Sequence, residues 1–82
     1  MNLAVKSVRS LDGYKLLLEF ENNEKKIFDV SPYLNLGKFS ELRDISLFNS
    51  VKISFDTIEW ANQLDFDPEL LYDTSIKANE NT

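Results

Sequence analysis

Apolar and polar residues alternate most clearly over residues 14–21, where every second side chain is aromatic or aliphatic. Leu17 is the one apolar residue on the other side of this pattern. A period of two predicts a β-strand with one buried face. Turn-forming pairs stand on either side of the strand, Asp12-Gly13 before it and Asn22-Asn23 after it. Residues 26–30 continue the alternation, so the pattern predicts two strands joined by a tight hairpin.

The second half of the chain combines helix-start signals with further alternation. Ser31-Pro32 is typical of a helix start, because Ser caps well and Pro loses no hydrogen bond at the first position. Residues 51–55 and 57–61 alternate again and predict a fourth and a fifth strand. Asp67-Pro68 opens a final helix, and we expect its residues 70–72 to face the sheet.

The order of these elements predicts an α+β fold. We expect a small two-layer domain of about five mainly antiparallel strands in a meander. Short helices are expected between the third and fourth strands and at the C-terminus. The first strand, over residues 3–10, has uneven apolar spacing, which favours a bulge or an edge position. We predict a single domain over residues 1–75 and a polar, disordered tail over residues 76–82.

The composition excludes several kinds of chemistry. The chain of 82 residues has no cysteine and no histidine. Disulfides, thiolate zinc sites and catalysis through Ser–His–Asp or Cys–His pairs therefore cannot be built from its own residues. We predict that the protein is not an enzyme and needs no cofactor.

The formal net charge of −5 changes the expected partners. A negative chain attracts neither phosphate backbones nor anionic lipid, and it suits a basic protein partner. We predict a protein partner, with no direct contact to nucleic acid or membrane. Lys15, Lys25 and Lys26 form at most a small basic spot, which is usually a solvated face. Neither a signal-like apolar region nor a stretch of ~18 apolar residues occurs, so we expect a cytoplasmic location.

Four sequence segments occur in a characteristic order: YKLLLEFENNEKKIFDVSPYL, GKFSELRD, LFNSVKIS and TIEWANQLDFDPELLY. This order resembles DUF2442, a small bacterial domain family of unknown function, over roughly residues 5–73. The most specific matches are Ile58-Glu59-Trp60 with the later Asp65, Asp67-Pro68 and Leu71-Tyr72, followed by Phe28-Asp29-Val30.

The resemblance has two departures and one functional implication. Ala61-Asn62-Gln63 stands where the family often has Pro-Asn-Gly, and Asn22-Asn23 stands where it often has glycine. Both are turn positions, so they concern local backbone geometry. The family resemblance implies little activity, but its genes often lie beside another small gene in what looks like a toxin–antitoxin pair. An antitoxin-like role is therefore implied.

Six residues are the candidates for partner binding or family-specific roles: Asp29, Glu59, Trp60, Asp65, Asp67 and Tyr72. The four carboxylates among them could converge on Mg²⁺ or Ca²⁺. The alternative, which we favour, is that Asp67 caps the last helix, Asp29 and Asp65 hold turns, and Glu59 is solvated. We expect Trp60 in the core, with one partner for its N–H, although an exposed anchor for a partner is the other interpretation.

Three functions compete at this point. The leading hypothesis is a non-enzymatic interaction module that uses a sheet face or edge and that could also form a homodimer through that edge. The second is an acidic inhibitor that occupies the nucleic-acid channel of another protein. Its surface would carry regularly spaced carboxylates: Glu19, Glu21, Glu24, Glu59, Asp65, Asp67 and Glu69. The third is a small metal-dependent enzyme built on the four carboxylates above.

Overall fold

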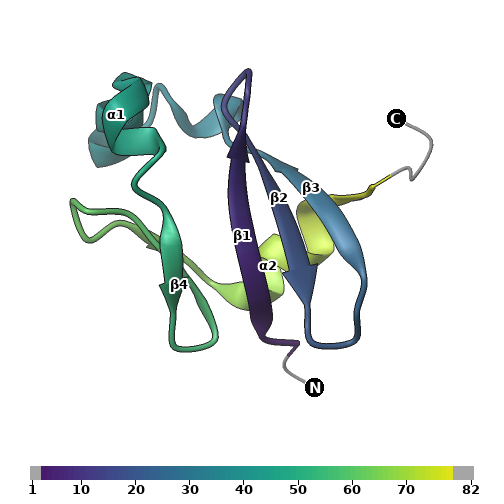
Figure 1. Ribbon diagram of the computed structural model, residues 1–82. Coiled ribbons are helices and arrows are strands. Elements are labelled where there is room, and N and C mark those ends of the chain that lie inside the picture. Colours follow the sequence, from purple (N-terminus) through teal and green to yellow (C-terminus); the bar gives the residue numbers. More distant parts are fainter. Residues whose placement is uncertain (1–2, 79–82) are drawn as a thin grey trace.

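Two antiparallel sheets joined by short helices form the structure of residues 3–78, which a computed structural model describes (Figure 1). The strands are β1 (Val5–Leu11), β2 (Lys15–Phe20), β3 (Lys25–Asp29), β4 (Lys52–Ser54), β5 (Thr57–Glu59), β6 (Asp65–Phe66) and β7 (Ile76–Lys77). The helices are the 3₁₀ segments η1 (Ser31–Tyr33) and η2 (Gly37–Arg43) and the α-helices α1 (Ile45–Phe48) and α2 (Pro68–Thr74). The four-stranded sheet has the order β1-β2-β3-β7, and the three-stranded sheet has the order β4-β5-β6. The predicted α+β class is confirmed.

The first three strands form where the alternation predicted them. Leu16 lies opposite Phe28 across the β2–β3 hairpin. Asn23 occupies the turn with a φ of 70°, a left-handed conformation that Asn tolerates better than most residues. β1 pairs with β2 and shifts register between Val5 and Ser7, which is the bulge that the uneven spacing predicted.

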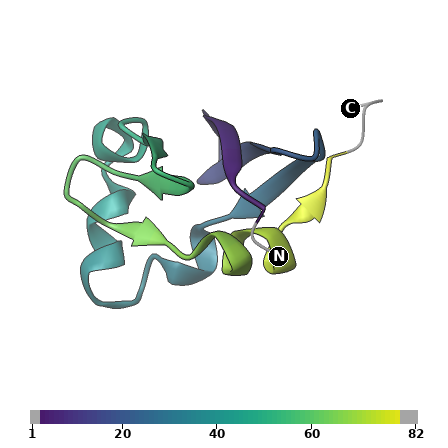
Figure 2. The same ribbon diagram turned by 90° about the horizontal axis from the view of Figure 1, so that it is seen from below.

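The predicted single meander is divided into two sheets. β4 pairs with β5, with Ile53 opposite Ile58, and β5 pairs with β6, with Ile58 opposite Phe66. The sequence did not predict β6, because a strand of two residues is too short to show an alternating pattern. The three helical segments between β3 and β4 carry the chain away from the first sheet, and the second sheet then lies beside the first (Figure 2).

Alternation with Ile53 predicts that Phe55 continues the fourth strand, but in the structure it does not. It lies in the two-residue turn between β4 and β5, because Ser54 and Thr57 already pair across the hairpin. Its φ is 55° and its side chain is 99% exposed. The apolar period therefore runs past the end of the strand.

One core lies between the two sheets and the helices. Its buried apolar side chains are Val5, Leu16, Leu18, Phe20, Phe28, Val30, Leu34, Leu42, Phe48, Ile58, Trp60, Phe66 and Leu71. Aromatic rings meet edge to face in this core, as Phe66 does with Phe28 and with Trp60. Both sheets therefore bury one face against the same cluster.

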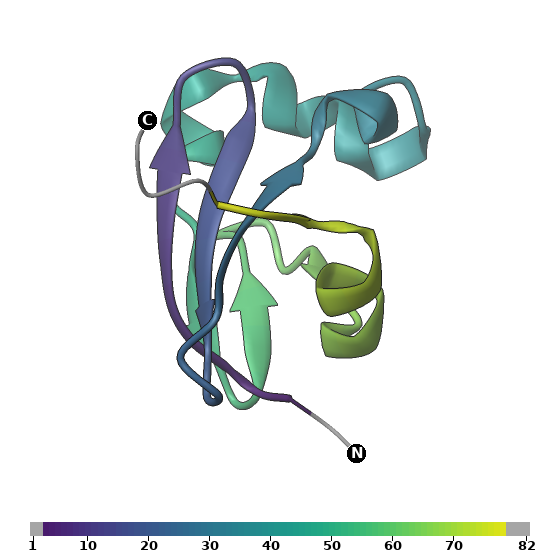
Figure 3. The same cartoon turned by 90° about the vertical axis from the view of Figure 1, so that its right-hand side faces the viewer.

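Helix α2 covers the core side of the four-stranded sheet, and β7 then runs along β3 (Figure 3). Leu71 is fully buried and Tyr72 is half-buried, but Leu70 is 36% exposed. The prediction that residues 70–72 all face the sheet is wrong for Leu70, because successive helical side chains point about 100° apart.

The start of the predicted tail also requires correction. Ile76 and Lys77 form β7, which pairs with Ile27 and Lys26 of β3. The amide of Ala78 donates to the carbonyl of Lys25 at 2.8 Å and extends this pairing. Residues 76–78 therefore belong to the domain, and the rest of the predicted tail, residues 79–82, lies outside the described residues.

Within residues 3–78, no helix has the length and apolar character needed to cross a membrane.

Candidate functional site

Trp60 lies in the core, as expected. Its side chain is 1% exposed, and its indole N–H donates to the carbonyl of Phe48 at 2.9 Å. This bond satisfies the only polar atom of the indole, which would otherwise be costly to bury. Trp60 is therefore a packing residue at the centre of the molecule and presents no surface to a partner.

Asp67 is the N-cap of α2, also as expected. Its carboxylate accepts from the amide of Glu69 at 3.2 Å. Glu59 and Asp65 are direct neighbours across the β5–β6 pair, on the face opposite buried Ile58. Asp65 is exposed and Glu59 is half-buried, so this short row of like charges faces solvent.

Asp29 ends β3 and holds the turn into η1. Its Oδ1 accepts from the amide of Ser31 at 3.0 Å and from the Ser31 hydroxyl at 2.7 Å. This is the local bonding that the sequence favoured for Asp29. Among residues 3–78, no group of three or more Asp or Glu side chains could hold a metal ion. Asp29, Glu59, Asp65 and Asp67 are thus not gathered into one cation site.

Tyr72 connects α2 to the β2–β3 hairpin. Its hydroxyl donates to the carboxylate of Glu24, and its ring packs edge to face on Phe20 with centroids 5.1 Å apart. Lys26 lies 3.8 Å above the ring and donates its Nζ proton to the Tyr72 carbonyl at 2.6 Å. Tyr72 therefore acts as a structural clamp between two elements that are distant in sequence.

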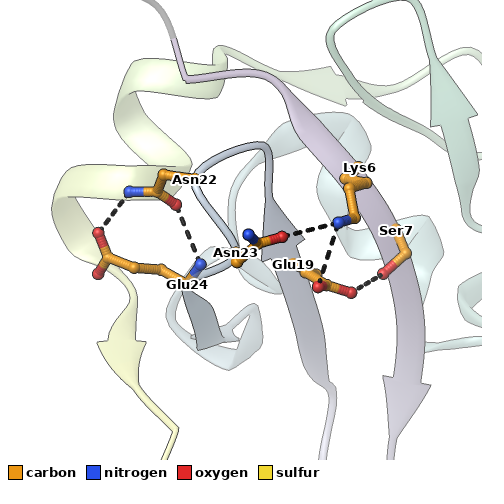
Figure 4. Close-up of polar contacts among 6 residues, drawn as sticks. All are labelled: Lys6, Ser7, Glu19, Asn22, Asn23 and Glu24. Atoms are coloured by element: carbon orange, nitrogen blue, oxygen red, sulfur yellow. Dashed lines mark hydrogen bonds and ion pairs between the residues drawn. The ribbon is translucent and has the colours of Figure 1, made fainter.

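The clamp also explains two pKa shifts. The hydrogen bond from Tyr72, and then that from Asn22, lowers the pKa of the Glu24 carboxyl. The same bond to Glu24 raises the pKa of the Tyr72 hydroxyl. Asn22 donates to the Glu24 carboxylate and accepts from the Glu24 amide, which fixes this side chain at the hairpin turn (Figure 4).

The most unusual surface is the side of the four-stranded sheet that faces away from the core, here called the outer face. Arg9, Leu17, Ile27 and Ile76 lie in register on β1, β2, β3 and β7 and form one row across the sheet. Leu17 and Ile27 are half-buried, and Ile76 is 74% exposed. Figure 1 shows α2 behind this sheet, on its other side. A row of apolar side chains is therefore partly exposed to solvent across the sheet.

Two open hollows reach this row. One, of about 750 Å³, lies on the outer face and is lined by Leu17 and Ile27 together with Arg9, Leu11 and Lys25. The other, of about 450 Å³, lies at the end of the β3–β7 pair, where residues of η1 and α2 line it beside Ile27 and Ile76. Ile27 and Lys77 line both, so the central isoleucine of the row borders both hollows.

Charged residues occupy the rows on either side of the apolar row. Lys15 lies opposite Leu11 and Asp29 in one flanking row, and Lys25 lies opposite Glu19 in the other. Lys6 pairs with Glu19 at 3.5 Å, and the Ser7 hydroxyl also contacts this carboxylate (Figure 4). Within residues 3–78 this is the one ion pair, so Arg9, Lys15 and Lys25 carry their charges without an ionic partner there.

The basic spot suggested by the sequence is divided between the two faces. Lys15 and Lys25 lie on the outer face, two positions from the apolar row. Lys26 lies on the core side, where it contacts Tyr72. Alternation along β3 separates these neighbouring lysines.

Sequence reasoning missed the apolar row. Leu17 was noted as the single apolar residue on its side, and Ile76 was assigned to the tail. Ile27 next to Phe28 was the available signal, since two adjacent apolar residues in a strand place one of them on each face.

Comparisons with known proteins identify the family. The model of the family described as "Protein of unknown function (DUF2442)" matches residues 5–77. Neither the curated proteins nor the solved structures contain a match to the chain. The family match covers all seven strands of the described residues, β7 included. The chain therefore belongs to the DUF2442 family.

Proposed function

We propose that this protein is a non-enzymatic interaction module that binds a protein partner through the outer face of its four-stranded sheet. One observation carries the proposal: Leu17, Ile27 and Ile76 form an uncovered apolar row that lines two hollows. Contiguous exposed apolar surface rimmed by polar groups is typical of contact sites.

The chemistry of the row supports protein binding. Antiparallel sheets commonly pack one face on the core and expose the other, whose side chains are then polar. Here the exposed face keeps branched apolar side chains at three paired positions, with Arg9 at the β1 end of the row and the other charges in the flanking rows. An apolar centre with a polar rim is the usual anatomy of a protein–protein contact.

The test uses two matched double variants of the tagged protein in the cells that make it. Leu17→Ser with Ile76→Ser removes two residues of the row. Leu36→Ser with Ile45→Ser is the control, since both side chains are 54% exposed and lie outside the four-stranded sheet. We expect one stoichiometric partner to be captured by the wild type and the control, and its recovery to fall at least about 10-fold with the row variant, a loss of about 1.4 kcal/mol of binding. Equal recovery with all three proteins would contradict the proposal.

Two narrower hypotheses from the sequence are answered by the same capture. An antitoxin-like role is the form of this proposal in which the captured partner is a small toxin. A homodimer through a sheet edge predicts instead that the captured protein is a second copy of the chain. The cytoplasmic location remains a prediction, which fractionation of the same cells would test.

No particular observation favours the acidic-inhibitor hypothesis. Three of the seven carboxylates that it relies on have structural partners: Glu19 bonds to Lys6, Glu24 to Tyr72, and Asp67 to the start of α2.

A further inference from the structure

We infer that the partner segment that binds the outer face is an acidic amphipathic helix. This inference rests on the proposed function and specifies the chemistry of its ligand. It differs from the expectation of a basic partner that the net charge of −5 suggested.

The charge distribution gives the sign of the partner. Five basic side chains lie on or beside the outer face or line its hollows, against three acidic ones: Lys6, Arg9, Lys15, Lys25 and Lys77, and Glu19, Glu24 and Asp29. The rest of the sequence then holds eleven acidic and four basic residues. The outer face is thus locally basic on an acidic protein.

All three carboxylates already have partners, which strengthens this contrast. Glu19 is paired with Lys6, Asp29 accepts two hydrogen bonds from Ser31, and Glu24 accepts from Tyr72 and Asn22. Within residues 3–78, Arg9, Lys15 and Lys25 have no ionic partner. An incoming carboxylate therefore meets three available cations, whereas an incoming ammonium meets three carboxylates that are already bonded. Complementary charge of this kind favours acidic partners and rejects basic ones.

The spacing of the row indicates a helix. Neighbouring strands are about 4.8 Å apart, so the four positions from Arg9 to Ile76 span roughly 14–15 Å across the sheet. A helix of about ten residues has this length, and its side chains three and four positions apart recur every ~5–6 Å along one face. Side chains on one face of a strand are about 6.6 Å apart and match the row less well.

The flanking rows place the cations where such a helix carries its polar residues. Lys15 and Lys25 are each two strand positions from the apolar row, about 6.6 Å to either side of it. Acidic residues beside the apolar stripe of the helix would contact these two lysines. A further acidic residue at the end of the helix would contact Arg9. A second copy of the chain fits less well, because it brings the same surplus of cations to the other side of the contact.

Defined peptides test the inference directly. Two labelled peptides of about 14 residues carry leucines at positions one, five, eight and twelve, with glutamates around them in one peptide and lysines in the other. Binding to the full chain is followed by fluorescence anisotropy, and the contact residues are mapped by amide chemical shifts. We expect the glutamate peptide to bind at least about 10-fold more tightly than the lysine peptide, to weaken severalfold between roughly 50 and 300 mM salt, and to shift β2, β3 and β7.

Matched variants separate this effect from general charge. Lys15→Ser with Lys25→Ser should weaken the glutamate peptide severalfold. Lys38→Ser with Lys52→Ser, exposed lysines outside the four-stranded sheet, should leave its affinity within about twofold. Equal binding of the two peptides, or equal losses in the two double variants, would overturn the inference.

Two further results would also overturn it, and they identify which proposal fails. If the natural partner is lost with Leu17→Ser and Ile76→Ser but the glutamate peptide has no advantage, the outer face binds a partner of another chemistry and the proposed function stands. A free chain that is dimeric by sedimentation, and monomeric with that double variant, would assign the outer face to a second copy. If capture does not depend on the row, the proposed function fails first.

Discussion

The two sheets of this domain bury one face in the same core, but their other faces differ in chemistry. The three-stranded sheet exposes a row of charges, in which Lys52 lies opposite Glu59 and Glu59 opposite Asp65. The four-stranded sheet exposes Leu17, Ile27 and Ile76 in the equivalent arrangement. Polar side chains are usual on the face of an antiparallel sheet that is exposed to water.

The difference shows that a face turned away from the core can follow either of two chemistries in one small domain. None of the three apolar side chains of the row belongs to the buried core of the described residues. Apolar pairs across the strands stabilise a sheet, but apolar surface in water lowers solubility. The proposed contact with a partner would account for the second chemistry.

The largest expected effect contrasts one isoleucine from each sheet. Ile58→Ser should destabilise the domain by about 2–5 kcal/mol, because Ile58 is fully buried and the new hydroxyl would lack a partner. Ile76→Ser should cost about 0.5 kcal/mol or less, since Ile76 is 74% exposed. Urea unfolding measures both. Similar losses for the two variants would mean that the row is part of the core.

The next contrast concerns two aspartates that stand close in sequence. Asp67→Ala should lower stability by about 1 kcal/mol, because it removes the cap of α2. Asp65→Ala should be neutral or slightly stabilising, since Asp65 lies opposite Glu59 and repels it. Thermal unfolding of the two variants provides the comparison. A larger loss for Asp65→Ala would indicate a role that its position in the strand does not explain.

These two contrasts also show how far the sequence alone could lead. The cap at Asp67, the core position of Trp60 and the β2–β3 hairpin all follow from local patterns of a few residues. The outer face does not, because β7 joins β3 from about fifty positions later and consists of only Ile76 and Lys77. Two residues carry no period, so their partner strand could not be predicted.

Phe55 illustrates the opposite failure, a pattern that continues beyond its element. The turn contains neither Gly nor Asn, the residues that signal a hairpin, so the alternation placed the end of the fourth strand too late, at Phe55. Only the structure shows that pairing of Ser54 with Thr57 leaves Phe55 outside the strand.

Phe55 yields a smaller predicted effect on the second sheet. Phe55→Asn should stabilise the domain by about 0.5–1 kcal/mol, because Asn tolerates positive φ and the 99% exposed ring gives up no buried contact. Phe55→Leu, which keeps the left-handed cost, is the control. Chemical unfolding should show a higher free energy of unfolding for Phe55→Asn than for Phe55→Leu. A loss of stability with Phe55→Asn would contradict the assigned turn.

The smallest expected effect is the pH dependence of the clamp on the first sheet. The pKa of Glu24 is lowered in the folded protein. Its contribution to folding stability is therefore complete above pH 4.5, the ordinary value, and is lost as pH falls through the lowered pKa. The pKa of Tyr72 is raised in the folded protein. Its contribution to folding stability is therefore complete below pH 10.0, the ordinary value, and is lost as pH rises through the raised pKa. The wild type should therefore exceed Tyr72→Phe in melting temperature between these limits.

Melting curves across the pH range test this clamp. The difference between the wild type and Tyr72→Phe should shrink at both ends of the range. A difference that is the same in acid as at neutral pH would exclude the Glu24–Tyr72 bond as its source.

The contrast between the two exposed faces is tested most directly by crosslinking inside the cells that make the protein. A photoreactive residue is placed at position 17 on the outer face in one protein and at position 59 on the charged face in another. We predict one discrete crosslinked product with another protein from position 17 and none from position 59. A discrete product from position 59 alone, or none from position 17, would contradict the assignment of the outer face as the binding surface.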